Sequence, residues 1–166
     1  DYLGEQVVNT ALKKFVQQYA FKGAPYPTTK NLIALIREET DPKHEAMIND
    51  LLERIVIYDL EVADVNVTPL EGGKFDVSID VSAGKFEADG AGMETAIPID
   101  DWIEIGVLGK KQGDYDTPEV LHLEKYHIDG SKLKFSIIVD KEPASVGIDP
   151  LNKLIDRNPD DNVIDV

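Results

Sequence analysis

The dipeptide His44-Glu45 is the part of the chain most similar to a catalytic motif. Zinc peptidases place two histidines four positions apart on one helix face, with a glutamate after the first histidine as general base. Here the second histidine position is occupied by Ile48. A metal would lose one ligand and meet a branched apolar side chain, so the pattern argues against a zinc site. We expect His44 and Glu45 to occupy the exposed first turn of a helix.

Two further histidines, His122 and His127, lie on one predicted strand, five positions apart. Side chains alternate between the two faces of a strand, so an odd separation places them on opposite faces. They cannot bind one metal together without a bulge. The spacing therefore predicts solvent-facing or cross-strand residues.

Acidic residues in the predicted loops raise the hypothesis of a calcium site, because Ca²⁺ prefers carboxylate oxygens. The candidates are Asp100 with Asp101, Asp114 with Asp116, and Asp160 with Asp161. None of these follows the spacing of an EF-hand loop. Carboxylates also cluster by chance on an acidic surface, so we expect solvated or helix-capping roles, with weak calcium binding left open.

Glycines and serines give no stronger signal. The segments Asp89–Gly92 and Gly109–Gly113 lack a Walker pattern and do not stand between a strand and a helix, so we expect turns. Ser131, Ser136 and Ser145 have no nucleophile-elbow context. The sequence thus predicts no catalytic, cofactor-binding or metal-ligating residue in this chain.

The aromatic residues of the second half could form a platform for a carbohydrate or a peptide. The set contains Trp102, Phe75, Phe86, Tyr115, Tyr126 and Phe135. Cores of β-sandwiches commonly hold one tryptophan and several phenylalanines. We therefore expect these side chains to lie in the core.

Composition excludes several classes of function. The 166 residues carry 17 Lys and Arg against 32 Asp and Glu, a formal net charge of −15, which argues against sequence-general nucleic-acid binding and against an anionic membrane surface. The chain has no cysteine, which removes disulfides and thiolate chemistry. No apolar run approaches the ~20 residues that span a bilayer, and there is no signal-peptide pattern. Because the chain begins at Asp1, we expect an excised piece, with any membrane anchor outside it.

Three helices are predicted in the first third of the chain. Apolar positions repeat at helical spacing from Gly4 to about Phe21. Thr28 or Thr29 can cap a second helix. Asp41-Pro42 repeats the start signal and predicts a third helix through about Ile55, with Met47, Ile48, Leu51, Leu52 and Ile55 facing inward.

The period changes from helical to two near Ile57, and about seven short strands follow. The first is expected to be irregular near Ala63-Asp64; the later ones run from about 75 to 81, 94 to 99, 102 to 108, 120 to 128 and 132 to 140, with a polar loop at 109–118. We predict an α+β chain: a short helical segment, then an antiparallel immunoglobulin- or fibronectin-like sandwich. The expected domains are 1–56 and 57–166.

The last residues, 144–166, carry an ordered series of signals rather than low complexity. Asp149-Pro150 suggests an N-cap and a first-turn proline, Leu151, Leu154 and Ile155 suggest one face of a short helix, and Asn158-Pro159 suggests its end. Arg157, near Asp156 and Asp160-Asp161, can fasten this tail by charge-assisted hydrogen bonds. We expect a docked structural tail.

Three segments also carry a resemblance. In order and rough spacing, Gly23–Leu32, Ile99–Gly106 and the tail from Val146 to Val163 resemble the C-terminal region of large bacterial membrane proteins that join an ABC-transporter-type permease region to a gluzincin zinc aminopeptidase region. The likeness covers nearly the whole chain but not the part that would do chemistry.

The resemblance implies a zinc-dependent aminopeptidase-like parent whose HExxH helix, distant glutamate ligand and catalytic tyrosine lie upstream of Asp1, so no catalytic or metal residue is carried over. It implies that residues 1–56 close the peptidase region and that 57–166 form a C-terminal sandwich. The expected function is a non-catalytic accessory domain of a membrane-associated parent. Its partners would be the upstream peptidase domain and the transporter region. The alternative is a free-standing fibronectin-like binding or adhesion module.

Overall fold

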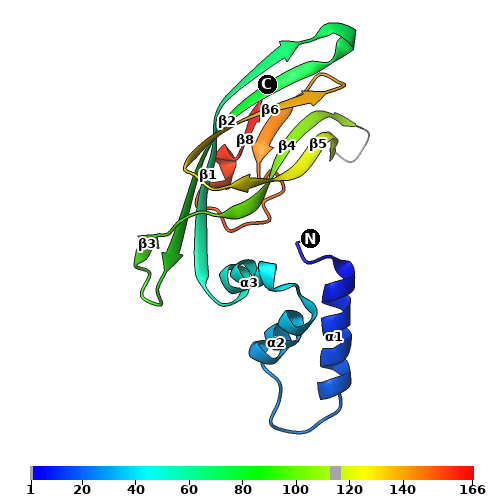
Figure 1. Ribbon diagram of the computed structural model, residues 1–166, viewed down its shortest axis with the longest axis vertical. Helices are drawn as coiled ribbons and strands as arrows, with labels where there is room; N and C mark the ends of the chain where they lie inside the picture. The colour runs from blue at the N-terminus through cyan, green and yellow to red at the C-terminus, as the bar shows by residue number, and fades with distance from the viewer. Residues whose placement is uncertain (1, 113–116) are drawn as a thin grey trace. The chain divides into compact units, whose positions relative to one another are not determined.

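The computed structural model describes residues 2–112 and 117–166, and the chain divides into two compact units, Asp1–Ile55 and Val56–Val166. The first unit is helical and the second is a pair of β-sheets (Figure 1). The predicted α+β fold, three helices followed by an antiparallel sandwich, is confirmed.

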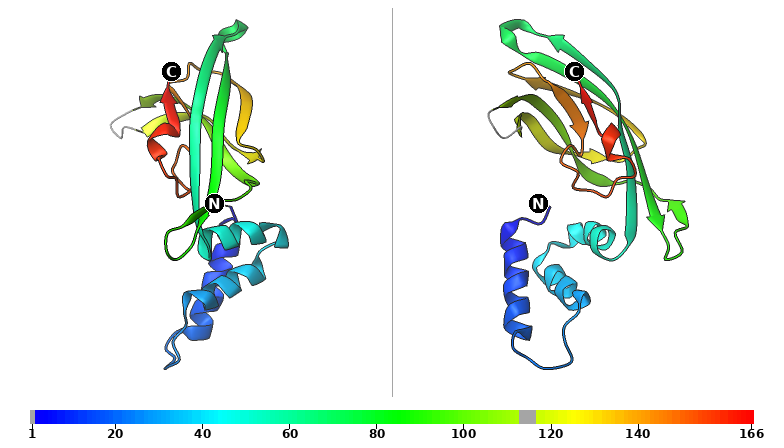
Figure 2. Two further views of the ribbon diagram at one scale, coloured as in Figure 1. Left: turned by 90° about the vertical axis from the view of Figure 1, so that its left-hand side faces the viewer. Right: turned by 180° about the vertical axis from the view of Figure 1, so that it is seen from behind.

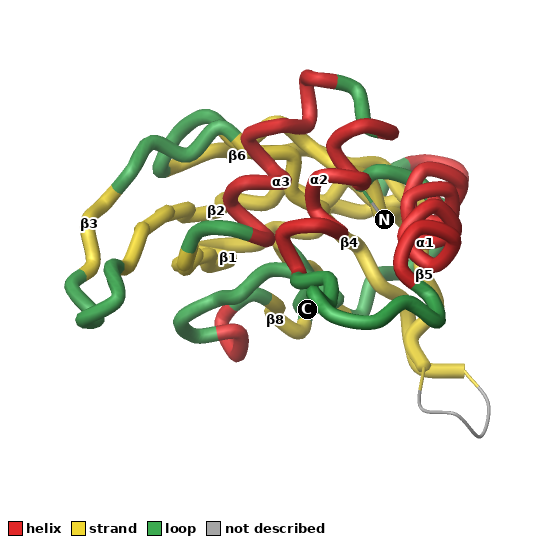
Figure 3. The backbone as a smooth tube through the Cα atoms, turned by 90° about the horizontal axis from the view of Figure 1, so that it is seen from below, coloured by secondary structure: helices red, strands yellow, loops and turns green. Residues whose placement is uncertain are grey.

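The helical unit contains α1 (Glu5–Tyr19), α2 (Thr29–Glu39), the 3-10 turn η1 (Pro42–His44) and α3 (Glu45–Leu52), which follows η1 directly. Figure 3 shows α1, α2 and α3 as separate helices. Thr28 is the N-cap of α2, and its N–H donates to Asn31 Oδ1 at 2.8 Å. The Asp41 carboxylate accepts from Lys43 N at 3.0 Å and caps η1. Thr28 and Asp41, the two residues that the sequence marks as helix starts, therefore both act as N-caps.

The third helix is shorter than predicted. It ends at Leu52, and a strand already begins at Ile55. Ile48 is buried, but Leu51, Leu52 and Ile55 are exposed, so the expectation that all of these face inward is wrong. Two turns of helix offer only one apolar stripe to their neighbours, and Ile48 lies on it.

The two longest strands, β1 (Ile55–Pro69) and β2 (Phe75–Ala88), form the extended hairpin seen in Figure 2, joined by the 3-10 turn η2 (Glu71–Gly73). In β1 the buried side chains are Val56, Tyr58, Leu60 and Val62, whereas further along the odd positions Val65 and Val67 pack on the core. The inward-facing parity therefore changes at Ala63-Asp64, where the sequence predicts an irregularity.

The strands form two antiparallel sheets. One sheet has the order β1-β2-β3, with β6 also paired to β2, and the other has the order β5-β4-β7-β8. The remaining strands are β3 (Glu94–Ala96), β4 (Asp101–Gln112), β5 (Thr117–Ile128), β6 (Lys132–Val139), β7 (Ser145–Ile148) and β8 (Val163–Asp165). Both sheets supply one apolar cluster, whose fully buried members are Leu60, Val77, Ile79, Val81, Ile103, Ile105, Val107, Ile128, Val146 and Ile148.

Four strands differ in extent from the prediction. β2 continues to Ala88, beyond its predicted end at about 81. β3 covers only Glu94–Ala96, and β4 and β5 extend into the stretch 109–118 that was expected to be a loop. Asp114, Tyr115 and Asp116 lie outside the described residues. Cross-strand pairing of Gln112 with Thr117 explains the extension, because ladder hydrogen bonds can order polar residues that carry no hydrophobic alternation.

The tail belongs to the second sheet. β7 pairs with β4, and β8 pairs with β7. The predicted short helix is wrong: Asp149 and Asn152 have φ of 45° and 50°, and Asn152 N donates to Asp149 O at 2.9 Å in a tight turn. Leu154 is buried, but Leu151 and Ile155 are exposed, because the left-handed residues break helical spacing.

Candidate functional site

His44 and Glu45 do not form part of a metal site in the described structure. Glu45 lies in the first turn of α3, and its carboxylate accepts from Arg37 Nε at 2.9 Å. His44 ends η1 and is half-buried, so the expectation that it is exposed is wrong. Ile48 is only 2% exposed and belongs to the interior of the helical unit, so the position of the missing second histidine has a packing role.

The two strand histidines are separated as their spacing predicts. In the β4–β5 ladder His122 pairs with Val107 and His127 with Trp102. Those β4 residues have opposite parity, so the imidazoles lie on opposite faces. His122 is 3.0 Å from the Tyr126 hydroxyl on its own strand, whereas His127 bonds to Asp100. They cannot share a metal.

Three of the acidic candidates, Asp100, Asp101 and Asp161, have partners within the chain. Asp101 accepts from the buried Lys85 Nζ at 2.7 Å, and Asp100 bonds to His127. Asp161 accepts from the Asn158 side chain. Within residues 2–112 and 117–166, no group of three or more His, Asp or Glu side chains is arranged to hold a metal ion. In the structure these three carboxylates are engaged in ion pairs and hydrogen bonds.

The glycine and serine candidates lie in turns and strands where the structure describes them. Asp89 Oδ1 accepts from Ala91 N at 2.8 Å and Met93 N at 2.9 Å, which makes the predicted turn. These bonds hold the pKa of Asp89 below its usual range, and the bond from Met93 N contributes most. Gly109 lies inside β4, so the prediction that a turn begins at Gly109 is wrong. Ser136 Oγ donates to Asp76 Oδ1 at 2.8 Å across the β2–β6 ladder.

Trp102 is the clearest departure from prediction. Its side chain is 58% exposed, so its assignment to the core is wrong. The other described aromatics of the set, Phe75, Phe86, Tyr126 and Phe135, are partly buried. Strand parity could have identified the exception, because Trp102 alternates with the buried Ile103, Ile105 and Val107 and therefore points to the outer face.

The tail covers part of that outer face. Lys153 Nζ donates to Glu104 Oε1 at 2.7 Å, and Asp149 N donates to Glu104 O at 2.8 Å. A Cβ built on Gly106 would lie 2.7 Å from Pro150 Cγ, so only glycine permits this approach. The cover accounts for the burial of Glu104, and β7 pairs with β4 only from Ile105 to Leu108. Trp102 lies beyond that pairing.

Asp149 organises the covering turn. Its carboxylate accepts from Lys153 N at 3.1 Å and from Leu154 N at 2.9 Å. Burial raises the pKa of this carboxyl above its usual range, opposed by the two N–H bonds. The Asp149 carboxylate thus acts as a cap, as predicted, although it caps a turn and not a helix.

Arg157 fastens the tail, but through acids other than the predicted ones. Its guanidinium donates to Asp59 Oδ2 at 3.1 Å and to Glu94, and lies 4.4 Å from the centre of the Phe86 ring. The predicted neighbour Asp156 instead accepts from Leu60 N at 3.0 Å. The charged neighbours of Arg157 in the sequence predicted that it fastens the tail. The partners of Arg157 are instead set by the bridge between Tyr58 of β1 and Asp156 of the tail.

The helical unit presents exposed apolar side chains on its helices and loops. They are Leu12 and Val16 on α1, Leu51 and Leu52 on α3, Ile55, and Phe21 and Tyr26 in the α1–α2 connection. We call the set Leu12, Val16, Leu51, Leu52 and Ile55 the helical apolar surface. The sequence predicts the amphipathic pattern of α1. It does not predict that Leu12 and Val16, two apolar residues of that pattern, remain exposed after α1 packs against α2.

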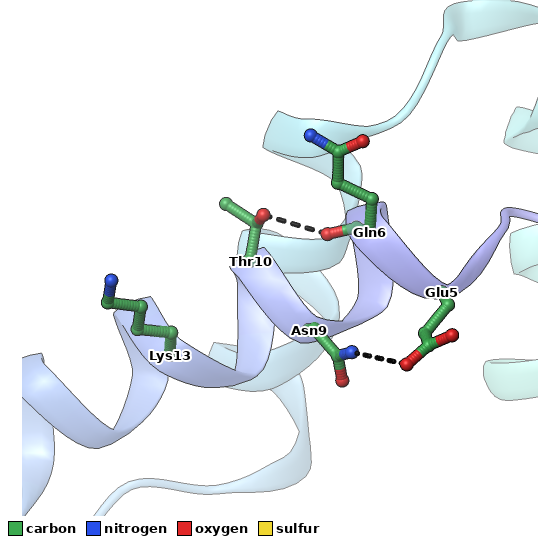
Figure 4. A pocket seen from close by; sticks show the side chains of 5 residues that line it. All are labelled: Glu5, Gln6, Asn9, Thr10 and Lys13. Carbon is green, nitrogen blue, oxygen red and sulfur yellow. Dashed lines mark hydrogen bonds between the residues drawn. The ribbon is translucent and has the colours of Figure 1, made fainter.

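A shallow hollow along α1 is lined by polar side chains of that helix alone (Figure 4). Asn9 Nδ2 donates to Glu5 Oε1 at 3.3 Å, and Thr10 Oγ1 donates to Gln6 O at 2.7 Å. These bonds link residues four positions apart on one helix face. No second element contributes a lining side chain to this hollow, so its polar groups do not converge on one point where a ligand could be held.

Among the described residues, no helix combines the length and apolarity needed to cross a bilayer. In comparisons with known proteins, the chain matched no family model, no curated protein and no solved structure.

Proposed function

We propose that this chain is a non-catalytic accessory region that packs, through its helical unit, on a peptidase-like domain of the same polypeptide. The observation that supports this most is the helical apolar surface. Leu12 is 41%, Val16 59% and Ile55 54% exposed. Isolated large apolar side chains are ordinary on protein surfaces, but Leu12 and Val16 are neighbours on one face of α1, and contiguous exposed apolar side chains mark interaction surfaces.

The resemblance gives the proposed neighbour. A gluzincin aminopeptidase-like region, linked to a transporter permease, would cover the helical apolar surface, and the β-sandwich would stand at the far end of the polypeptide. In this proposal zinc belongs to the neighbouring region. The histidines and carboxylates of this chain serve packing, turns and ion pairs.

The test measures hydrogen exchange of the chain alone and with the peptidase-like region added. We expect added protection in α1 and α3, which carry the surface. Val16→Glu should weaken the association at least tenfold because it places a charge in an apolar contact. Gln17→Glu adds the same charge at the adjacent exposed position and should weaken it much less.

Two outcomes would overturn the proposal. One is exchange protection confined to the β-sheets. The other is stoichiometric zinc in the purified chain together with aminopeptidase turnover.

A binding or adhesion module is the second candidate, and one observation favours it. Trp102 is largely exposed on a sheet face, stacked against His127 with ring centres 5.4 Å apart. Exposed tryptophans are characteristic of recognition surfaces.

A further inference from the structure

Trp102 and His127 form an exposed aromatic pair across the β4–β5 ladder. They face each other in register, and their ring planes are inclined by 28°. The imidazole stacks beside the indole without burying it, since Trp102 keeps 58% of its surface exposed. A tryptophan π-face open to solvent is available to a partner.

Two carboxylates flank this pair, one just before β4 and one just after β5. His127 Nε2 bonds to Asp100, and His127 Nδ1 lies 4.0 Å from Asp129 Oδ2. The two carboxylate side chains are 78% and 65% exposed. We call Trp102, His127, Asp100 and Asp129 the Trp102 patch.

The acids of the Trp102 patch differ from their neighbours on β4. Asp101 pairs with Lys85, and Glu104 pairs with Lys153, both at 2.7 Å. In the described part of the chain, by contrast, neither Asp100 nor Asp129 pairs with a lysine or an arginine. No lysine or arginine ion pair therefore neutralises these two described carboxylates, and they stand beside an open aromatic face.

This combination selects for a cation. Arginine stacks on the face of tryptophan and binds carboxylates in a fork, so one guanidinium can use both features. A phosphate or another anion would meet two carboxylates on a chain of net charge −15. We propose that the Trp102 patch is a docking site for an arginine-bearing segment of a partner protein. This goes beyond the proposed packing of the helical unit and uses none of its residues.

The expected strength follows from the exposure of the groups. An exposed cation–π contact or ion pair changes affinity by about two- to fivefold. One arginine would therefore bind weakly, and a segment with two or more arginines is required for measurable affinity.

The chain supplies its own reporter, because Trp102 is its only tryptophan. The experiment titrates the whole chain with the peptide acetyl-Gly-Arg-Arg-Gly-amide and follows fluorescence, with acetyl-Gly-Gln-Gln-Gly-amide as the neutral control. We expect a saturable change with the arginine peptide alone. Asp100→Asn and Asp129→Asn should each weaken binding about two- to fivefold.

Asp64→Asn is the matched control, because it removes one negative charge from an exposed position on β1 and should change affinity by less than about 1.5-fold. Trp102→Ala, followed by calorimetry, should weaken binding about two- to fivefold, while the circular dichroism spectrum stays that of the parent. If Asp64→Asn weakened peptide binding as much as Asp100→Asn and Asp129→Asn do, general charge attraction would explain the binding and the proposed site would be wrong. An equal response to the glutamine peptide or to maltose, or no response to arginine, would overturn it as well.

Discussion

The helical unit and the β unit bury their apolar side chains to different extents. In the β unit both sheets face one continuous cluster that includes Ile79, Ile105 and Ile148, each 0% exposed. In the helical unit the buried apolar residues among those described are Ala11, Ile33, Leu35 and Ile48. Small units bury a smaller fraction of their surface. The comparison teaches that the β unit carries its own core, whereas the helical unit has apolar surface left for a partner.

Polar contacts compensate partly in the helical unit. Arg37 on α2 donates to Glu45 and Asn49 of α3 and to Glu53 just beyond it, and Lys14 on α1 pairs with Glu39. These groups are at least partly exposed, and exposed ion pairs contribute little stability. They fix how the helices meet, but they do not replace a buried core.

Deleting residues 146–166 should have the largest effect on this comparison. It removes β8, most of β7 and the tail residues that contact β1. We expect the β unit to lose its cooperative unfolding, because β4 would lose its pairing with β7 and the core would lose Val146 and Ile148. Urea unfolding followed by Trp102 fluorescence measures this. A truncated chain with an unchanged midpoint would contradict the assignment of the tail to the core.

A matched pair of truncations should sharpen the comparison. Ile105→Ala removes a fully buried side chain and should lower the free energy of unfolding by about 2–5 kcal/mol. Leu52→Ala, on the exposed side of α3, should change it by less than about 0.5 kcal/mol. The measurement is chemical denaturation of both variants. Similar losses would mean that the helical apolar surface is already covered within this chain.

The smallest effect concerns the pH dependence of Asp149. Burial raises its folded-state pKa above the unfolded value, so its protonated form favours folding. That stabilisation is present below the unfolded pKa and is lost as the pH rises through the folded pKa. Asp149→Asn cannot ionise. The stability of the parent relative to this variant should therefore fall as the pH rises from below about 3.9, the ordinary pKa of an aspartate, through the raised folded-state pKa.

Denaturation of both proteins at each pH isolates this group from the other carboxylates. Asp89 has the opposite shift, so its contribution is present above the unfolded pKa and lost on acidification. It cancels because both proteins share it. A relative stability that rises with pH would show that the bonds from Lys153 N and Leu154 N outweigh the burial of Asp149.

Much of the fold could be predicted because its signals are local. Thr28 and Asp41 mark helix starts through their own side chains, and the alternation in β2 assigns Val77, Ile79 and Val81 to one face. The candidate site could be predicted less well. The exposure of Trp102 depends on how far along β4 the tail extends. The tail is distant in sequence, since the bond between Glu104 and Lys153 joins residues 49 positions apart.

The sequence by itself determined the order of the helices and of the strands as far as β6, the irregularity at Ala63-Asp64 and the opposite faces of His122 and His127. These depend on backbone periodicity and on capping chemistry within a few residues. Only the tertiary structure decided that the tail becomes β7 and β8, that Arg157 pairs with Asp59 and Glu94, and that Trp102 is exposed. Each of these depends on contacts between residues far apart in the chain, whose partners no local pattern specifies.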